Sequence, residues 1–149
     1  MDFLKCDILS VKSGVLAHGT NCLGVMGAGV AKHIKNAYPH VYTKYVEYCN
    51  KSCATDIIGT TQLIEINQYF TIANCFTQID IRTEENKSPA KLEWVLSSLE
   101  QVCDLTKHEI IHIPKIGCGL GGLDWRDVEK IIHYLEMEYK NKFVIHIIK

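Results

Sequence analysis

The chain has 149 residues, of which 47% are hydrophobic and 22% are charged, with a formal net charge of -1. A chain of this length folds as about one domain around one core, so we expect residues 1–149 to form a single domain. The balance of 16 Lys and Arg against 17 Asp and Glu excludes a strongly basic surface for gripping duplex nucleic acid or an anionic membrane. The N-terminus lacks the pattern of a signal peptide, and no apolar run approaches the roughly 20 residues that cross a bilayer. We therefore expect a soluble, cytoplasmic monomer.

Seven cysteines are scattered along the chain without a CxxC pair and without zinc-finger spacing to the seven histidines. An odd number of unclustered cysteines favours reduced thiols that pack as small hydrophobic residues. We therefore predict neither a metal site nor a cofactor.

The first half of the chain alternates apolar runs with helical patterns, which is typical of strands interleaved with helices. In chain order, residues 2–9 and 13–18 are predicted strands, and the second stops at a glycine-rich segment that begins at Gly19. Helices are predicted over residues 30–36 and 41–49.

The middle of the chain predicts a strand pair and a helix. Strands are expected over residues 59–66 and 69–78, and the short turn between them makes this pair antiparallel. Ser88-Pro89 predicts a helix start, with Ser as the N-cap and Pro at the first helical position. The apolar stripe of this helix consists of Leu92, Val95, Leu96, Leu99, Val102 and Cys103.

The last part of the chain repeats the alternation. A buried strand over residues 109–116 leads into a glycine run, Asp124 caps a helix, and residues 143–148 form a closing strand. Together the elements predict an α/β fold, specifically a three-layer α/β/α sandwich with a mixed, mostly parallel central sheet.

Two glycine-rich loops each follow a predicted strand and lead into a helix. They read Asn21-Cys-Leu-Gly24-Val-Met-Gly27-Ala-Gly29-Val and Gly117-Cys-Gly119-Leu-Gly121-Gly122-Leu-Asp124-Trp. Glycine lets the backbone turn with positive φ and approach a ligand closely, and the free N–H groups at a helix N-terminus attract anions. The pair could cradle a diphosphate without a Lys or Arg.

Other interpretations of the glycines stand beside this one. They could simply allow tight turns, and Gly117, Gly119 and Gly122 also satisfy the GxGxxG pattern of dinucleotide-binding folds. That pattern belongs in the first strand-to-helix turn and is followed by a strand ending in an acid, whereas this loop lies near the C-terminus. A P-loop is excluded because the chain has no GK[ST].

The stretches His18-Gly-Thr-Asn21-Cys-Leu-Gly24-Val-Met-Gly27-Ala-Gly29-Val-Ala31 and Ile113-Pro114-Lys-Ile-Gly117-Cys-Gly119-Leu-Gly-Gly122-Leu-Asp-Trp125 resemble the two phosphate loops of macrodomains. The resemblance covers essentially the whole chain and implies a domain that binds ADP-ribose. In detail it is greatest to the branch with ADP-ribose-1''-phosphate phosphatases, terminal ADP-ribose glycohydrolases and macrodomain antitoxins that reverse DNA ADP-ribosylation.

The resemblance also implies individual roles. Asp7 matches the acid that receives the adenine amino group, and Cys6 stands where the family usually has Gly. Asn21 matches the asparagine that contacts the distal ribose. The full set of implied ADP-ribose contacts is Asp7, Ile8, Asn21, Gly27, Ala28, Gly29, Val30, Gly117, Cys118, Gly119, Leu120 and Gly121.

The glycohydrolase branch relies on a lysine after the fourth strand and, in some members, on an aspartate in the second loop. This chain has Gln78 and Gly121 at those positions, so a lysyl intermediate is not expected. The phosphatase type has a histidine that closes the second strand, and His18 stands there. An imidazole with a pKa near 6.5 can give or take a proton at neutral pH, and Asp80 is the nearest candidate carboxylate.

We therefore predict a hydrolase that converts ADP-ribose-1''-phosphate to ADP-ribose and phosphate without a metal, with His18 and Asp80 as catalytic residues. Two other functions remain open: removal of ADP-ribose from a modified protein or nucleic acid, and a non-catalytic reader that only binds ADP-ribose. His18 as a hydrogen-bonded core residue and Asp80 as an ordinary loop acid are the structural alternatives.

Overall fold

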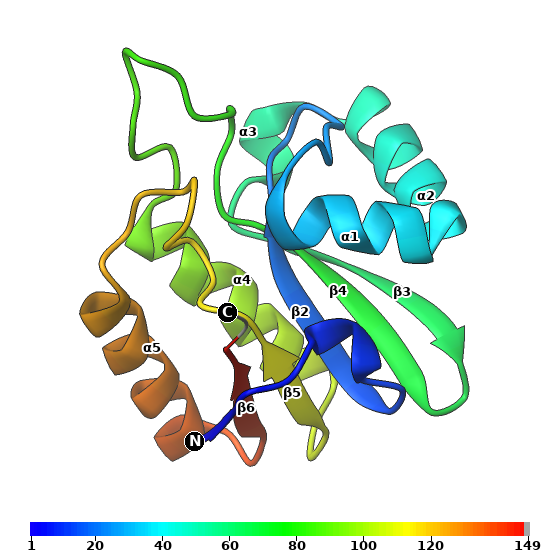
Figure 1. The fold of residues 1–149 in the computed structure, drawn as a ribbon, viewed down its shortest axis with the longest axis vertical. Coiled ribbons are helices and arrows are strands. Elements are labelled where there is room, and N and C mark those ends of the chain that lie inside the picture. The colour runs from blue at the N-terminus through cyan, green and yellow to red at the C-terminus, as the bar shows by residue number, and fades with distance from the viewer. Residues whose placement is uncertain (148–149) are drawn as a thin grey trace.

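The computed structural model describes residues 1–147, which form one six-stranded sheet with helices on both faces (Figure 1). The strands are β1 (Asp2–Leu4), β2 (Gly14–Thr20), β3 (Thr61–Asn67), β4 (Phe70–Phe76), β5 (Ile110–Ile113) and β6 (Lys142–His146). The helices are the short 3₁₀ turn η1 (Ile8–Ser10), α1 (Gly29–Ala37), α2 (Pro39–Asn50), α3 (Ala54–Ile57), α4 (Leu92–Leu105) and α5 (Trp125–Glu138). Within residues 1–147, no helix combines the length and the apolar character needed to cross a membrane.

The strand order is β1-β6-β5-β2-β4-β3, and only β3 runs antiparallel to its neighbour β4. The predicted antiparallel pair is therefore confirmed, as is the mixed, mostly parallel sheet. A short turn suffices for the antiparallel pair, whereas every parallel connection needs a crossover, and the helices provide it.

Alternate side chains of the sheet enter two different cores because successive residues of a strand point to opposite faces. Val15 and Ala17 of β2 pack with α4 and α5. Leu16 points the other way and packs with Ile34 of α1 and Val41 of α2. Figure 1 shows this division, with α1 and α2 on one face of the sheet and α4 and α5 on the other. The predicted three-layer sandwich is confirmed.

The first predicted strand, residues 2–9, is wrong in its second half. The strand ends at Leu4, and the chain then forms η1. The Asp7 side chain accepts a hydrogen bond from Leu9 N at 2.9 Å, and Ser10 Oγ donates to Asp7 O at 2.6 Å. Such local side-chain hydrogen bonds compete with a strand ladder, so the apolar residue Ile8 is buried from a turn instead.

The predicted helix start at Ser88-Pro89 is also wrong, because α4 begins at Leu92 with Lys91 as its N-cap. Ala90 N donates to Gly121 O at 3.1 Å, and Lys91 N donates to Thr77 O at 3.2 Å. These long-range bonds hold the segment extended as it passes between β4 and the second glycine loop. The local capping signal was outweighed by tertiary hydrogen bonds.

The remaining helices and strands differ from prediction mainly at their ends. The strand predicted over residues 109–116 covers only Ile110–Ile113, since Pro114 cannot donate to the next ladder bond. Asp124 caps α5 as predicted, with its side chain accepting from Arg126 N. The closing strand is β6, and Ile148 of its predicted range lies outside the described residues.

Candidate ligand-binding cleft

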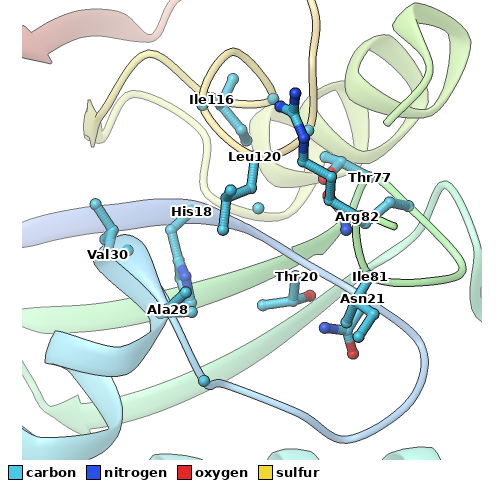
Figure 2. A pocket seen from close by; sticks show the side chains of 18 of the residues that line it. His18, Thr20, Asn21, Ala28, Val30, Thr77, Ile81, Arg82, Ile116 and Leu120 are labelled. Carbon is cyan, nitrogen blue, oxygen red and sulfur yellow. The ribbon is translucent and has the colours of Figure 1, made fainter. Parts of the chain in front are cut away.

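A cavity of about 820 Å³ opens at the carboxyl ends of β2 and β5, between the two glycine loops (Figure 2). The loop after β2 leads into α1 on one face of the sheet, and the loop after β5 leads toward α5 on the opposite face. The two connections therefore diverge from neighbouring parallel strands, and such switch points are where open α/β sheets bind ligands. The volume lies within the usual range for small-molecule sites.

Side chains hold the first glycine loop in place. Asn21 Nδ2 donates to Val25 O at 2.8 Å, and Asn21 Oδ1 accepts from Leu23 N at 3.0 Å. The buried Tyr45 hydroxyl from α2 lies 2.7 Å from Asn21 O and 2.8 Å from Asn21 Oδ1. Burial raises the pKa of Tyr45, so its hydroxyl stays a donor. The Asn21 amide thus organises the loop and lines the cleft with one remaining Nδ2 hydrogen.

Several backbone amides of both loops have no acceptor in the part of the chain that the structure describes. The N–H groups of Gly29, Val30 and Ala31 open α1, where no preceding turn supplies a carbonyl. In the second loop, the amides of residues 119–121 donate to no acceptor within residues 1–147. All of these residues line the cleft. The arrangement presents partial positive charge from two sides, which suits an anionic ligand.

Three of the cleft glycines have open space where a side chain would project. A Cβ on Gly29 or Gly119 would meet nothing within 4 Å, and one on Gly27 would make only an ordinary contact with Val25 at 3.6 Å. Packing within the protein therefore does not require glycine at Gly27 or Gly119. Close approach by a ligand would require it.

Packing does require glycine at other positions of the second loop. A Cβ on Gly121 would lie 2.6 Å from Gly117 O, and one on Gly122 would lie 2.4 Å from Lys87 O. The tight-turn interpretation of the glycines is therefore correct for these residues. It also means that position 121 has no room for an acidic side chain.

His18, two residues before the end of β2, lines the cleft and is almost fully buried. A directional chain of hydrogen bonds fixes its ring: Gln62 Nε2 donates to Lys44 O at 3.3 Å, and Asn74 Nδ2 donates to Gln62 Oε1 at 3.1 Å. Asn74 Oδ1 is thereby left to accept from His18 Nε2, 2.6 Å away. Burial lowers the pKa of His18 to about 4, although the bond to Asn74 acts in the opposite direction. The ring is neutral at pH 7, and its Nδ1 is a lone pair without a protein partner in residues 1–147.

Several of the predicted site residues lie outside this cavity. Asp7 is exposed and caps η1, and Ile8 is buried in the core beneath α1. The Cys118 thiol turns toward Ile116 O, 3.4 Å away. Asp80 is exposed, and only its backbone oxygen is bonded, to Gln78 Nε2 at 2.6 Å. Contact of these residues with a ligand stays a prediction.

The cleft contains charged residues that sequence reasoning missed. Arg82 and Glu84 come from the long loop after β4, and Lys115 comes from the segment after β5. Lys115 Nζ lies over the Trp125 ring, 5.6 Å from its centroid. Arg82 makes no salt bridge within residues 1–147, and Figure 2 shows it on the same side of the cleft as Leu120. The loop that carries Arg82 and Glu84 has no hydrophobic periodicity, so the sequence gave no signal for the position of these side chains.

The described residues bring together no group of three or more His, Cys, Asp or Glu side chains suited to hold a metal ion. The polar lining consists instead of amides, hydroxyls and isolated charges.

The three-layer fold and the cleft between two glycine loops are the features that the sequence analysis associated with macrodomains. The comparison with protein families supports the same assignment. The family model "Macro domain" matches residues 17–132, which is most of the chain. The chain therefore belongs to the macrodomain family, and the resemblance seen in its two loops is confirmed.

Individual relatives fall into two groups. An ADP-ribose 1''-phosphate phosphatase of Meyerozyma guilliermondii is 29% identical over 160 residues, covering 89% of this chain and 91% of that protein. A DNA ADP-ribosyl glycohydrolase of Mycobacterium tuberculosis is 30% identical over 128 residues, which cover 83% of this chain but only 35% of that protein. Among solved structures, the macrodomain of Mycobacterium tuberculosis DarG has a TM-score of 0.81 with 26% identity and covers 97% of this chain and 95% of that one.

Proposed function

We propose that this chain binds ADP-ribose in the cleft and hydrolyses ADP-ribose-1''-phosphate to ADP-ribose and phosphate. The amides around Gly29 and Gly119 that lack an acceptor in residues 1–147 support the binding proposal most directly, because these residues line one cavity and belong to two loops that each lead into a helix. A diphosphate is the group that such opposed amides suit best. Full-length relatives named as ADP-ribose 1''-phosphate phosphatases support the same substrate.

In this proposal His18 acts as a proton acceptor. Its Nε2 hydrogen is held by Asn74, its buried Nδ1 has no hydrogen-bond partner among residues 1–147, and burial keeps the ring neutral. Water attacks phosphorus, the bond from phosphorus to the ribose oxygen breaks, and the water proton passes to His18 Nδ1. The ribose oxygen must then gain a proton. Asp80 is our candidate for assisting the departure of this ribose oxygen. Among the acidic residues of the described chain, Glu84 is the one that lines the cleft.

Arg82 is proposed to hold the terminal phosphate. Its guanidinium lines the cleft without a carboxylate partner in the described part of the chain, and a planar fork of donors matches phosphate oxygens. This assignment adds one cation to a cradle that we had expected to work through amides alone.

Removal of ADP-ribose from nucleic acid is the second candidate, because relatives of about 30% identity are named as DNA ADP-ribosyl glycohydrolases. Two observations favour the phosphatase over a glycohydrolase that uses lysine and aspartate. Gln78 lines the cleft where that lysine would stand, and Gly121 has no space for an aspartate side chain.

The test combines ADP-ribose binding by calorimetry with phosphate release from ADP-ribose-1''-phosphate. We expect wild type to bind and release, and His18→Ala and Asp80→Ala to bind but lose turnover. Arg82→Gln should raise KM by roughly tenfold to a hundredfold, since a hydrogen bond to a charged group contributes about 1.5–3 kcal/mol. Arg126→Gln is the matched control, because Arg126 is exposed and pairs with Asp124 outside the cleft.

Each other outcome points elsewhere. Binding without phosphate release would overturn the phosphatase and leave a glycohydrolase or a reader, which ADP-ribosylated DNA and protein as substrates would separate. Failure to bind ADP-ribose would overturn the whole proposal.

A further inference from the structure

Three titratable side chains form a hydrogen-bonded row away from the cleft. Cys6 Sγ lies 3.4 Å from His146 Nδ1, and His146 Nε2 lies 2.8 Å from His112 Nδ1. Cys6 follows β1, His146 ends β6, and His112 belongs to β5, so the row crosses three neighbouring strands. None of the three lines the cavity between the glycine loops.

The Cys6 thiol and the Cys6 carbonyl oxygen both lie 3.4 Å from His146 Nδ1, so the direction of the hydrogen bonds along the row depends on the tautomer of His146. If the Cys6 thiol donates to His146 Nδ1, the neutral imidazole carries its hydrogen on Nε2 and donates it to His112 Nδ1. His112 suits the acceptor role because burial, and secondarily charge on His146, lower the pKa of His112 and keep it neutral. In this tautomer His146 Nδ1 can take up the thiol proton, and His112 Nδ1 then accepts a hydrogen bond from Nε2 of the positively charged His146 ring.

The same geometry argues against a shared metal ion. Cys6 and His112 contact opposite nitrogens of the His146 ring, so the three groups cannot converge on one ion. The arrangement resembles a nucleophile, a base and an orienting group, which is how proteins activate a thiol.

Cys6 differs from the other cysteines in combining exposure with a base. His146 is buried, at 4% exposure, whereas the Cys6 side chain is open to solvent. Ser10 Oγ lies 3.9 Å from Cys6 Sγ, and its hydrogen is donated to Asp7 O at 2.6 Å. Cys53 is also exposed, but its thiol makes no side-chain hydrogen bond within residues 1–147.

We propose that Cys6, His146 and His112 form a second reactive site, at which the Cys6 sulfur attacks small electrophiles and in particular hydroperoxides. The sulfur attacks the terminal peroxide oxygen, an S–O bond forms, and the O–O bond breaks. The thiol proton, held on His146, passes to the departing alkoxide. Cys6 is oxidised to the sulfenic acid, and the hydroperoxide is reduced to an alcohol, or to water when it is hydrogen peroxide.

Modification of Cys6 would disturb the adjacent turn η1. Ser10 Oγ contacts Cys6 Sγ and also donates to Asp7 O, and the Asp7 carboxylate caps the turn that contains Ile8. A group added to the sulfur disturbs the residues predicted to contact adenine. We therefore expect weaker ADP-ribose binding after modification of Cys6, and this consequence rests on the proposed function.

The site is tested by labelling the native protein with limiting iodoacetamide, and separately with hydrogen peroxide, and quantifying each cysteine by peptide mass spectrometry. Cys53 is the internal reference, and the buried Cys75 and Cys103 report unfolding. We expect Cys6 to react roughly tenfold faster than Cys53, as activated thiols do. Equal rates for Cys6 and Cys53 in wild type would overturn the proposal.

Substitution of the histidines identifies the cause. His146→Gln should bring Cys6 to the rate of Cys53, and His112→Gln should lower the Cys6 rate partially, because His112 acts only through His146. The Cys53 rate should not change. A folded His146→Gln variant, with Cys75 and Cys103 unlabelled, that kept the wild-type ratio would overturn the role of the histidine. If that variant does not fold, the His112→Gln ratio decides.

The effect on binding is measured by calorimetry with ADP-ribose before and after labelling, in wild type and in Cys6→Ser. We expect several-fold weaker binding only in labelled wild type. Unchanged affinity of fully labelled protein would overturn the link to the cleft. Failure of untreated Cys6→Ser and untreated wild type to bind would instead count against the proposed function.

Discussion

The two glycine loops reach neighbouring positions at the edge of the sheet by different physical means. The first loop is shaped by a side chain, the Asn21 amide, which the buried Tyr45 hydroxyl holds in turn. The second loop is shaped by the absence of side chains, because Gly121 and Gly122 pack directly against backbone. Each loop nevertheless contributes to the same cavity residues whose amides have no acceptor within residues 1–147. Glycines in one motif therefore have different roles: Gly121 and Gly122 are required by packing, whereas Gly119 has open space where a side chain would project.

Gly122→Ala should have the largest effect on the fold. Its φ of +82° is unfavourable for alanine, and the new Cβ would lie 2.4 Å from Lys87 O and 2.7 Å from Ser88 Cα. We expect a loss of roughly 3–5 kcal/mol in the free energy of unfolding, measured by urea denaturation. A loss below about 1 kcal/mol would mean that the second loop does not depend on this packing.

Acidification should destabilise the protein because the buried His18 side chain resists protonation. The pKa of His18 is about 4 in the folded protein against 6.5 as a free side chain, so the unfolded chain binds more protons between these values. The free energy of unfolding should therefore fall as the pH drops from 6.5 to 4, by up to roughly 3 kcal/mol. Denaturation at several pH values measures this.

His18→Gln should flatten this pH dependence, whereas His108→Gln, at an exposed histidine, should preserve it. Equal slopes in wild type and His18→Gln would contradict a buried neutral imidazole. The lowered pKa of His112 adds a contribution of the same sign, which should remain in the His18 variant.

Tyr45→Phe removes the hydroxyl that holds Asn21 while keeping the aromatic ring. We expect a loss of about 1–2 kcal/mol, since the buried Asn21 oxygens lose a donor. Hydrogen exchange should rise in residues 21–26 and remain unchanged in residues 117–123. An equal rise in both loops would show that they are not held independently.

Gly119→Ala should have the smallest effect on stability, within about 0.5 kcal/mol of wild type, because its Cβ would meet no protein atom within 4 Å. The added methyl group should still weaken ADP-ribose binding by roughly tenfold, the effect of about 1.4 kcal/mol of lost contact. The variant thus separates ligand contact from folding. Unchanged affinity would remove the second loop from the proposed binding site.

Most of the fold could be predicted from local patterns, and the misses have one cause. The stripe from Val95 to Cys103 and the cap at Asp124 both appear in the structure. The helix start at Ser88-Pro89 and the second half of the first strand do not. In both places hydrogen bonds formed by folding, or within a turn, outweighed a plausible local signal.

The candidate site divides in the same way. His18 and the two loops stand next to strand ends, so sequence position predicted that they would meet at one edge of a parallel sheet. Asp80 was chosen by proximity in sequence; it is exposed and does not line the cavity, so its catalytic role stays a prediction. Arg82, two residues later, lines the cleft, because the direction of a side chain on an irregular loop depends on contacts that no periodic pattern records.

The sequence by itself determined the alternation of strands and helices, the two glycine loops and their family, because periodicity and backbone freedom are properties of short segments. The tertiary structure alone decided which glycines face the cavity, the protonation of His18 and the row from Cys6 to His112. Those features depend on burial and on hydrogen bonds between residues 34 to 140 positions apart in the chain, and such pairs meet only once the sheet has assembled.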